Sequence, residues 1–217
     1  MKIRTLLLAC VVLLNCACAT KTLQVTVPEV PPAPHPLAYV KIVAVNDVRQ
    51  FARSPTTAST PSIENDLIDN KSITDKAIGR MRHGLLHKAL WNYTLTGDET
   101  IYSVCSKIVI NSLNLAGLNV VSAGEEGYAE AVPIAVDVVQ FWAWMQPQFN
   151  IDLHFDGELR LTSTDNSRPL SVSATGNEFF STAYAGGSAW TKLVNQGVAD
   201  LQQNLTDQLQ QSELANP

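Results

Sequence analysis

The chain has 217 residues, a net charge of −5 and 46% apolar residues, enough for one domain with a core of its own. Its 15 basic residues are outnumbered by 20 acidic ones, which argues against nucleic acid as a partner, because such binding depends on phosphate neutralisation by Lys and Arg. Of four cysteines only Cys105 lies beyond residue 18, so no intramolecular disulfide is expected in the folded part.

The first residues have the layout of a secretory signal. A basic start with Lys2 and Arg4 precedes an apolar run at 5–14, far shorter than the roughly 20 residues that span a bilayer. The sequence N-C-A-C follows at 15–18. A cysteine at the cleavage point resembles a bacterial lipoprotein signal, whose lipobox cysteine becomes the acylated N-terminus of the mature protein.

Cys18 is the preferred lipidation site, and Cys16 is the alternative. Cys18 has alanine on both sides, whereas a bulky amide, Asn15, precedes Cys16. The resemblance implies a covalent diacylglycerol and an N-acyl chain such as palmitate, and no other cofactor. No Asp follows the cysteine, which favours the periplasmic face of the outer membrane. An ordinary cleaved signal with incidental cysteines is the competing interpretation.

Removal of residues 1–17 as a signal peptide leaves about 200 residues with 13 basic and 20 acidic side chains, a net charge of −7. Residues 18–37 are expected to form a Pro-rich tether, with five prolines between 27 and 36. Polyproline II geometry would let this tether hold the domain on the order of 50 Å from the anchor.

The pattern of apolar residues predicts the elements of one domain over 38–211. A strand at 38–47 is followed by an insertion at about 52–97 that contains a helix at 72–92. An amphipathic helix then runs from Asp98 to Leu115, with Gly117 as its C-terminal cap, and a short strand follows at 118–122.

The second half predicts three strands and a helix: 131–145, 149–163, 170–181 and 188–210, before a flexible tail at 212–217. Short turns between these strands imply an antiparallel meander. The predicted fold class is α+β, an antiparallel sheet of about five strands covered by two amphipathic helices, as a two-layer sandwich with a partly helical insertion after the first strand.

The chain resembles the YajG-like lipoproteins, a largely uncharacterised envelope family. The similarity rests on the lipobox cysteine, a Pro/Val-rich leader, a strand ending V-A-V-N-D-V-R at 43–49, the sequence L-N-L-A-G-L-N-V-V at 113–121, the strand 131–139 and the final helix from Trp190. It covers roughly residues 18–210, with an insertion longer than the family pattern. It implies a membrane-anchored protein of the cell envelope and carries over no catalytic residue.

Two features are candidates for binding a partner. The first is a basic face on the insertion helix, including Arg80, Arg82, His83 and Lys88, suited to an acidic partner or lipid headgroups, or simply solvated. The second is the F-W-A-W-M run at 141–145, where Trp142 and Trp144 share one strand face. These tryptophans fit either core packing or a subunit contact.

No convergent catalytic set or metal site stands out. His83 and His87 have the spacing of a zincin, but Gly84 replaces the required Glu. Asp152, His154 and Asp156 alternate on one strand and are best explained as a solvated sheet face.

These features predict a non-catalytic lipoprotein, a structural or adaptor subunit with protein partners in the envelope. The alternative is an auxiliary lipoprotein of a lipid-transport or secretion machine that binds an apolar ligand between sheet and helices. A hydrolase using His154 with Asp152 or Asp156 is the third possibility.

Overall fold

The structure is a computed structural model that describes residues 19–64, 67–82, 89–147, 149–165 and 167–216. Its strands are β1 (Ala19–Leu23), β2 (Ala38–Asp47), β3 (Ala77–Arg82), β4 (Ala89–Leu95), β5 (Leu118–Val120), β6 (Val132–Pro147), β7 (Ile151–Ser163) and β8 (Ser171–Thr182). Its helices are α2 (Lys71–Thr74), α3 (Ile101–Leu115) and α4 (Gly187–Gln210).

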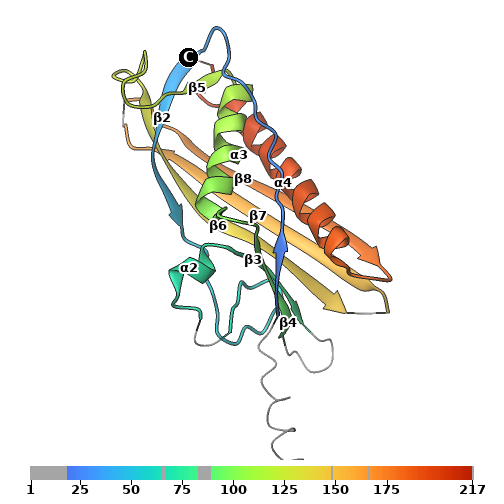
Figure 1. Ribbon diagram of the computed structural model, residues 1–217. Helices are drawn as coiled ribbons and strands as arrows, with labels where there is room; N and C mark the ends of the chain where they lie inside the picture. The colour runs from blue at the N-terminus through green and yellow to red at the C-terminus, as the bar shows by residue number, and fades with distance from the viewer. Residues whose placement is uncertain (1–18, 65–66, 83–88, 148, 166, 217) are drawn as a thin grey trace, which may run out of the picture.

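Strand β6 is the centre of one mixed sheet (Figure 1). Along one edge it pairs with β7 over almost its whole length, and β7 in turn pairs with β8. Along the other edge it pairs first with β2, over 132–138, and then with β3, at 143–144. Strand β5 extends the sheet beyond β2, and β4 and β1 extend it beyond β3. The sheet therefore forks on this side of β6.

Helices α3 and α4 cover one face of the sheet, the inner face (Figure 1). Their apolar sides and the inward residues of β6, β7 and β8 form the main core, in which Trp190 of α4 stacks on Tyr93 of β4 at 4.2 Å between ring centroids. Among the described residues, no helix combines the length and the apolar character needed to cross a bilayer. Residues 48–76, which contain α2, supply the side chains that cover Trp142 and Trp144 on the opposite, outer face.

Several sequence predictions are confirmed. The first strand spans Ala38–Asp47, the three late strands form an antiparallel meander, and Gly117 ends α3 with a φ of +81°. The sheet is larger than the predicted five strands and is not purely antiparallel, because β1–β4, β2–β5, β2–β6 and β3–β6 are parallel pairs. Between β2 and β6, α3 runs back along the sheet, and such a crossover makes the flanking strands parallel.

The predicted helix at 72–92 is wrong. Among the described residues of this region, only Lys71–Thr74 form a helix, and 77–82 and 89–95 are the antiparallel strands β3 and β4. Gly79 favours strand pairing over a helix here, because it allows β3 to approach β6 closely: a Cβ at this position would lie 2.7 Å from the backbone oxygen of Ala143. The close approach of β3 to β6 thus needs a glycine, a residue that is unfavourable inside a helix.

The structure also differs from the tether expected at 18–37. Residues 19–23 are strand β1, and Leu23 and Val25 are buried in the main core. The following segment, residues 24–37, crosses the helix layer and is called the strap here. Prolines leave its backbone without strand partners, and asparagine side chains of the helices and β5 supply hydrogen bonds instead: Asn111, Asn114, Asn119 and Asn195.

The tail is likewise not free over its described part. Leu214 and Ala215 are buried, and the backbone continues in turns after α4, with Ser212 N–H donating to the carbonyl of Leu209. Leu214 packs against the main core, a contact that the sequence pattern did not reveal.

Helix α4 lies directly on β7 and β8 because three glycines leave room at the contact. Gly157 and Gly176 are paired across the strands, Gly176 lies against the backbone of Gly197 and Leu201, and Gly197 lies against the ring of Phe155. A Cβ on Gly176 would lie 2.4 Å from the backbone nitrogen of Leu201. This contact places Asp200, Asn204 and Gln208 beside the free edge of β8, where they accept from Asn177 N–H and donate to the carbonyls of Thr175 and Ser173. The helix thereby blocks an open strand edge.

Arg49 fills the fork beside β6. Its side chain is fully buried and makes a bidentate pair with Asp47 through Nε and Nη2, at 2.8 and 2.7 Å. The remaining N–H groups donate to the carbonyls of Ala77, Phe141 and Thr74. All five donors of the guanidinium are therefore used. Arg49 joins the end of β2, the start of β3 and α2 to the central strand.

We expect Gly176→Ala to destabilise the protein by about 3 kcal/mol, because overpacking a contact with backbone atoms cannot be relieved by a rotamer change. Chemical denaturation measures this loss. Gly187→Ala is the matched control, since nothing lies within 4 Å of a Cβ there, and it should leave stability unchanged or slightly raised. Equal effects of the two variants would contradict the close-packing argument.

Arg49→Met should lower the free energy of unfolding by about 3–5 kcal/mol, because Asp47 and three carbonyls lose a buried partner. Arg53→Met is the control. Arg53 pairs with Asp69 at 2.6 Å, but its side chain is 54% exposed, so removing its charge should cost at most about 1 kcal/mol. If both variants lost a similar small amount of unfolding free energy in urea denaturation, the structural role of Arg49 at the fork would be ruled out.

Candidate functional site

The predicted site residues fall into two groups. The lipidation candidates Cys18 and Cys16, together with His83 and Lys88 of the predicted basic face, lie outside the described residues. Arg80 and Arg82 of β3 and the two tryptophans of β6 share the outer face, and Arg80 is the direct register partner of Trp144. The structure thus brings together two candidates that the sequence treated separately.

Trp142 and Trp144 are core residues of a second, smaller cluster. They are 1% and 6% exposed and pack with Ile63 and Ala77. Phe51 meets Trp142 edge to face at 6.0 Å between ring centroids, and Trp142 Nε1–H donates to the carbonyl of Ala58. Of the two interpretations, core packing under residues 48–76 describes both rings as they stand in the structure.

The prediction of an exposed helical basic face is wrong for Arg80 and Arg82. Arg80 and Arg82 stand on a strand, and Arg80 is 7% exposed. Arg80 lies 4.0 Å from Glu64, while Arg82 donates to the hydroxyl of Ser62 at 2.5 Å. Burial and the neighbouring charge of Arg80 lower the pKa of Arg82. The guanidinium groups serve the contact between β3 and residues 62–64 instead of forming a solvated patch.

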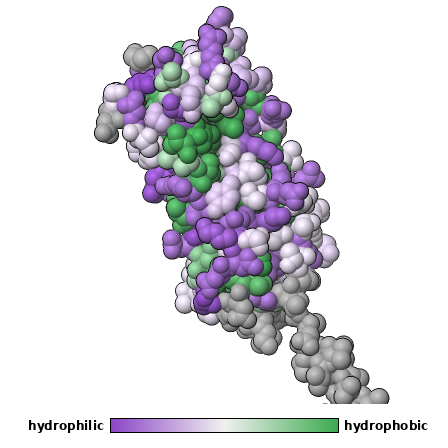
Figure 2. Space-filling view, turned by 60° about the vertical axis from the view of Figure 1, so that its left-hand side comes forward, coloured by the Kyte–Doolittle hydropathy of each residue, from purple (hydrophilic) through white to green (hydrophobic). Residues whose placement is uncertain are grey.

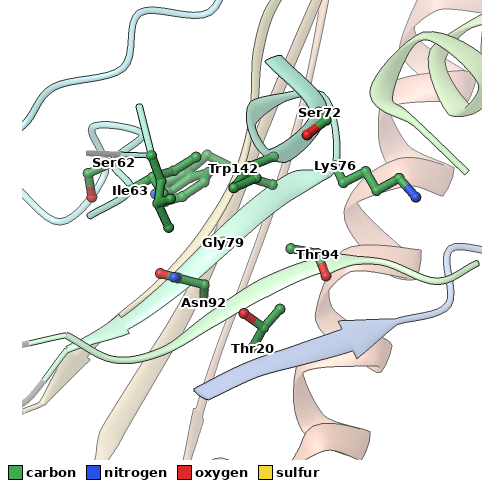
Figure 3. Close-up of a pocket in the computed structure, with 12 residues that line it drawn as sticks. Thr20, Ser62, Ile63, Ser72, Lys76, Gly79, Asn92, Thr94 and Trp142 are labelled. Carbon is green, nitrogen blue, oxygen red and sulfur yellow. The ribbon is translucent and has the colours of Figure 1, made fainter. Parts of the chain in front are cut away.

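A pocket of about 220 Å³ opens between the outer face and the segment 62–76. Figure 3 shows Thr20, Asn92 and Thr94 on β1 and β4 at its floor, with Trp142 and Ile63 above them. The apolar wall is Ile63, Leu67, Ile73, Ala77 and Trp142, and the polar lining is Thr20, Ser62, Ser72, Lys76, Asn92 and Thr94. We call this the outer-face pocket. It combines an apolar wall with a few polar groups, as ligand-binding sites generally do.

Asn92 gives the pocket an unused hydrogen-bond acceptor. The residue is 8% exposed, and its Oδ1 is buried without a partner. Arg80 pairs with Asn92 across β3 and β4, and Arg80 Nε is also buried without a partner. Leaving such groups unpaired costs about 1–3 kcal/mol each, so a native protein retains them where they have a role or a partner.

A row of rings continues the outer face beyond the pocket. Trp144, His154 and Phe179 are register partners on β6, β7 and β8. The Trp144 and His154 rings stack at 5.0 Å with 6° between their planes, and Phe179 lies 4.9 Å from His154. Phe179 is 53% exposed, so the row leads from a buried tryptophan to the surface.

The position of His154 in this stack affects its protonation. Desolvation lowers the pKa of the imidazole, against the opposite effect of Asp152 and Asp156, and its Nε2 is buried without a hydrogen bond. Burial raises the pKa of Asp156. Neither carboxylate is hydrogen-bonded to the ring, because both stand two residues away along β7 while the ring stacks across the strands. In this arrangement the contacts of His154 are with the rings of Trp144 and Phe179 on the neighbouring strands.

Other reactive groups are few in the described part of the chain. It contains no group of three or more His, Cys, Asp or Glu side chains placed to hold a metal ion. Cys105 is fully buried on α3, and burial raises its pKa to about 12, so the thiol packs as a small apolar group.

Comparison with known proteins does not assign a family. The sequence matches no protein-family model and no curated protein. Similar solved structures include XCC0632 from Xanthomonas campestris, of the family DUF330, with 13% identity over 88% of this chain and 91% of that one, and a TM-score of 0.42. An uncharacterised protein shows 11% identity, coverage of 88% and 99%, and a TM-score of 0.46.

A third structure is lipoprotein GNA1162 from Neisseria meningitidis. It shows 12% identity over 75% of this chain and 96% of that one, with a TM-score of 0.27. Similarities at this level carry no assignment, so the YajG-like resemblance stays a prediction.

His154 should make stability depend on pH. Because its folded pKa lies below the ordinary value of 6.5, the unfolded chain takes up this proton first as the pH falls. We expect the free energy of unfolding to decrease from pH 7 to pH 5, and to decrease less in His154→Phe, which keeps an aromatic ring in the stack. Urea denaturation across this range measures the two slopes. Identical slopes would show that the imidazole is not held neutral by its surroundings.

Proposed function

We propose that the protein is a lipid-anchored lipoprotein of the bacterial envelope that acts by binding, without catalysis, as an adaptor subunit on the periplasmic face of the outer membrane. The observation that carries the binding role is the unpaired Oδ1 of Asn92 in the outer-face pocket. An acceptor held dry in this way is ready to take a donor from a partner.

The signal-like N-terminus supports the anchor. Strand β1 starts at Ala19, directly after the preferred lipidation site, Cys18. Its five residues pair with β4, so an acyl group on Cys18 would be joined to the sheet itself. Three acyl chains in this class of lipid make membrane attachment stable.

The pocket favours a partner group of mixed character. The wall of Ile63, Leu67 and Trp142 suits a compact apolar body, while Asn92 requires a hydrogen-bond donor beside it. A side chain from an envelope protein meets both requirements, and the exposed ring of Phe179 offers a second contact on the same face.

A small apolar ligand is the second candidate. It corresponds to an auxiliary subunit of a lipid-transport or secretion machine. The five apolar residues of the pocket wall favour it. Its place would differ from the one expected from sequence, because the space between sheet and helices is occupied by the main core, including Trp190 and Tyr93.

The test places a photocrosslinking residue, p-benzoylphenylalanine, at Leu67 on the pocket wall, with and without Asn92→Leu. We expect one discrete adduct in envelopes, reduced about tenfold by Asn92→Leu, because a partner's donor then loses its acceptor. The same crosslinker at Ser173, exposed on β8, is the positional control. Asn92→Leu should leave thermal stability equal or higher, since it removes a buried unpaired group of similar size.

The outcomes separate the candidates. A protein adduct sensitive to Asn92→Leu supports the adaptor, and a bound small molecule in native mass spectrometry that is lost in the same variant supports the ligand carrier. An adduct of equal yield in both backgrounds, or none at Leu67, would refute the role of the pocket.

A further inference from the structure

The start of β1 lies at the same end of the sheet as the β6–β7 turn. Ala19 pairs with Trp91 of β4, and Trp91 pairs with Met81 of β3. The residue before Met81, Arg80, pairs with Trp144, close to Pro147, where β6 ends. Figure 1 shows β6 and β8 running toward the lower part of the molecule, where β1 begins. We call this the hairpin end of the sheet.

The exposed aromatic rings of the described residues gather at the hairpin end. Phe149 in the β6–β7 turn is fully exposed, Tyr184 after β8 is 80% exposed, and Phe179 near the end of β8 is 53% exposed. Tyr184 is held in place by a turn in which its N–H donates to Thr182 Oγ1 and its carbonyl accepts from the same hydroxyl. Figure 2, in which the left side of Figure 1 faces forward, also shows apolar residues in the upper half of the molecule. The exposed large apolar residues other than Phe149, Phe179 and Tyr184 are aliphatic.

Two further rings at the hairpin end each have a lysine over them. Lys21 lies over Trp91, with Nζ 3.9 Å from the ring centroid, and Lys192 lies over Phe180 at 5.8 Å. Both pairs belong to the hairpin end, because Trp91 is the partner of Ala19 and Phe180 precedes Thr182 by two residues. Aromatic rings with adjacent cations are the residues found at membrane–water interfaces.

We propose that the hairpin end rests on the lipid surface, with Phe149 and Tyr184 at the level of the headgroups. This inference rests on the proposed function, in which Cys18, or Cys16 two residues earlier, carries the lipid. A chain extends at most about 3.3–3.6 Å per residue, so one to three residues cannot hold the sheet far from the acyl chains. The occupant of this aromatic surface is therefore the membrane to which the protein is tied.

The arrangement reverses the expectation of a long spacer. The prolines of the strap lie after β1, across the helices, and contribute no distance between lipid and domain. The outer-face pocket, whose floor includes Thr20, then opens close to the membrane surface.

The test uses the acylated protein in phosphatidylcholine vesicles, with single labelling sites for the environment-sensitive dye NBD. Phe149→Cys reports the hairpin end, and Glu126→Cys, exposed in the loop before β6, reports the opposite end. The parent protein treated with the dye controls for Cys105, which is buried, and for Cys16 or Cys18. We expect NBD at 149 to brighten several-fold on incorporation and to be quenched by headgroup-proximal doxyl lipid, while NBD at 126 stays as in water.

Flotation of a Cys18→Ser, Cys16→Ser double variant separates the two levels of the argument. If this variant floats with vesicles as the parent does, or the parent does not float, the lipid anchor is wrong and the inference falls with it. If the parent floats by its lipid but NBD at 149 remains aqueous, the anchor stands and the membrane contact is refuted. Brightening at 149 without quenching by doxyl lipid would indicate a protein contact and would also overturn the proposal.

Discussion

The buried guanidinium of Arg49 is the interaction on which the arrangement of this molecule depends. Strand β6 changes partner along one edge, from β2 to β3, and a sheet that forks leaves backbone carbonyls without a strand beside them. Arg49 supplies the missing donors to Phe141 and Ala77 while Asp47 balances its charge. A planar group with five fixed donors suits this role, which a lysine could not fill. Because the same guanidinium also binds the carbonyl of Thr74, the segment over the outer face is fixed to the sheet at this point.

The sequence predicts the regular parts of the fold because their patterns are local. The alternation in β7 and the apolar stripes of α3 and α4 are visible within windows of ten to twenty residues, and the structure has these elements at the expected places. The region 72–92 fails for a physical reason. Its strands are stabilised by contacts with residues far away, above all Gly79 against Ala143, and nothing within the segment marks a strand. The parallel pairing of β1 with β4 is hidden in the same way.

The candidate site was only partly predictable. The two faces of the F-W-A-W-M run follow from strand alternation, so Trp142 and Trp144 are found on a shared face as expected. Asn92 carries no signal in sequence, because its importance lies in an unpaired atom that only burial reveals. In the sequence, Arg49 stands out only as the last residue of the 43–49 segment that resembles the YajG-like proteins. Its role was not predicted, because its five hydrogen bonds depend on where Thr74, Ala77 and Phe141 meet. The docking of the strap on the helices was not predicted, because a high density of prolines indicates an extended chain but does not show whether asparagine side chains bind it.

The two faces of the sheet are built for different tasks. On the inner face, Gly157, Gly176 and Gly197 let the backbone of α4 contact the strands. Polar side chains of the same helix bind the backbone at the edge of β8, so that another strand cannot pair there. On the outer face, a short segment covers two tryptophans but leaves a pocket with unpaired polar atoms beside it. A fold selected only for stability would have paired or removed those atoms, since each reduces stability. Such atoms occur on both faces, since Tyr93 Oη and Trp190 Nε1 are buried without a partner in the main core, but Asn92 Oδ1 is the one that belongs to a residue lining the pocket. With the proposed anchor at Cys18, a partner bound in this pocket would be connected to the membrane through β1, because Thr20 of this strand lines the pocket.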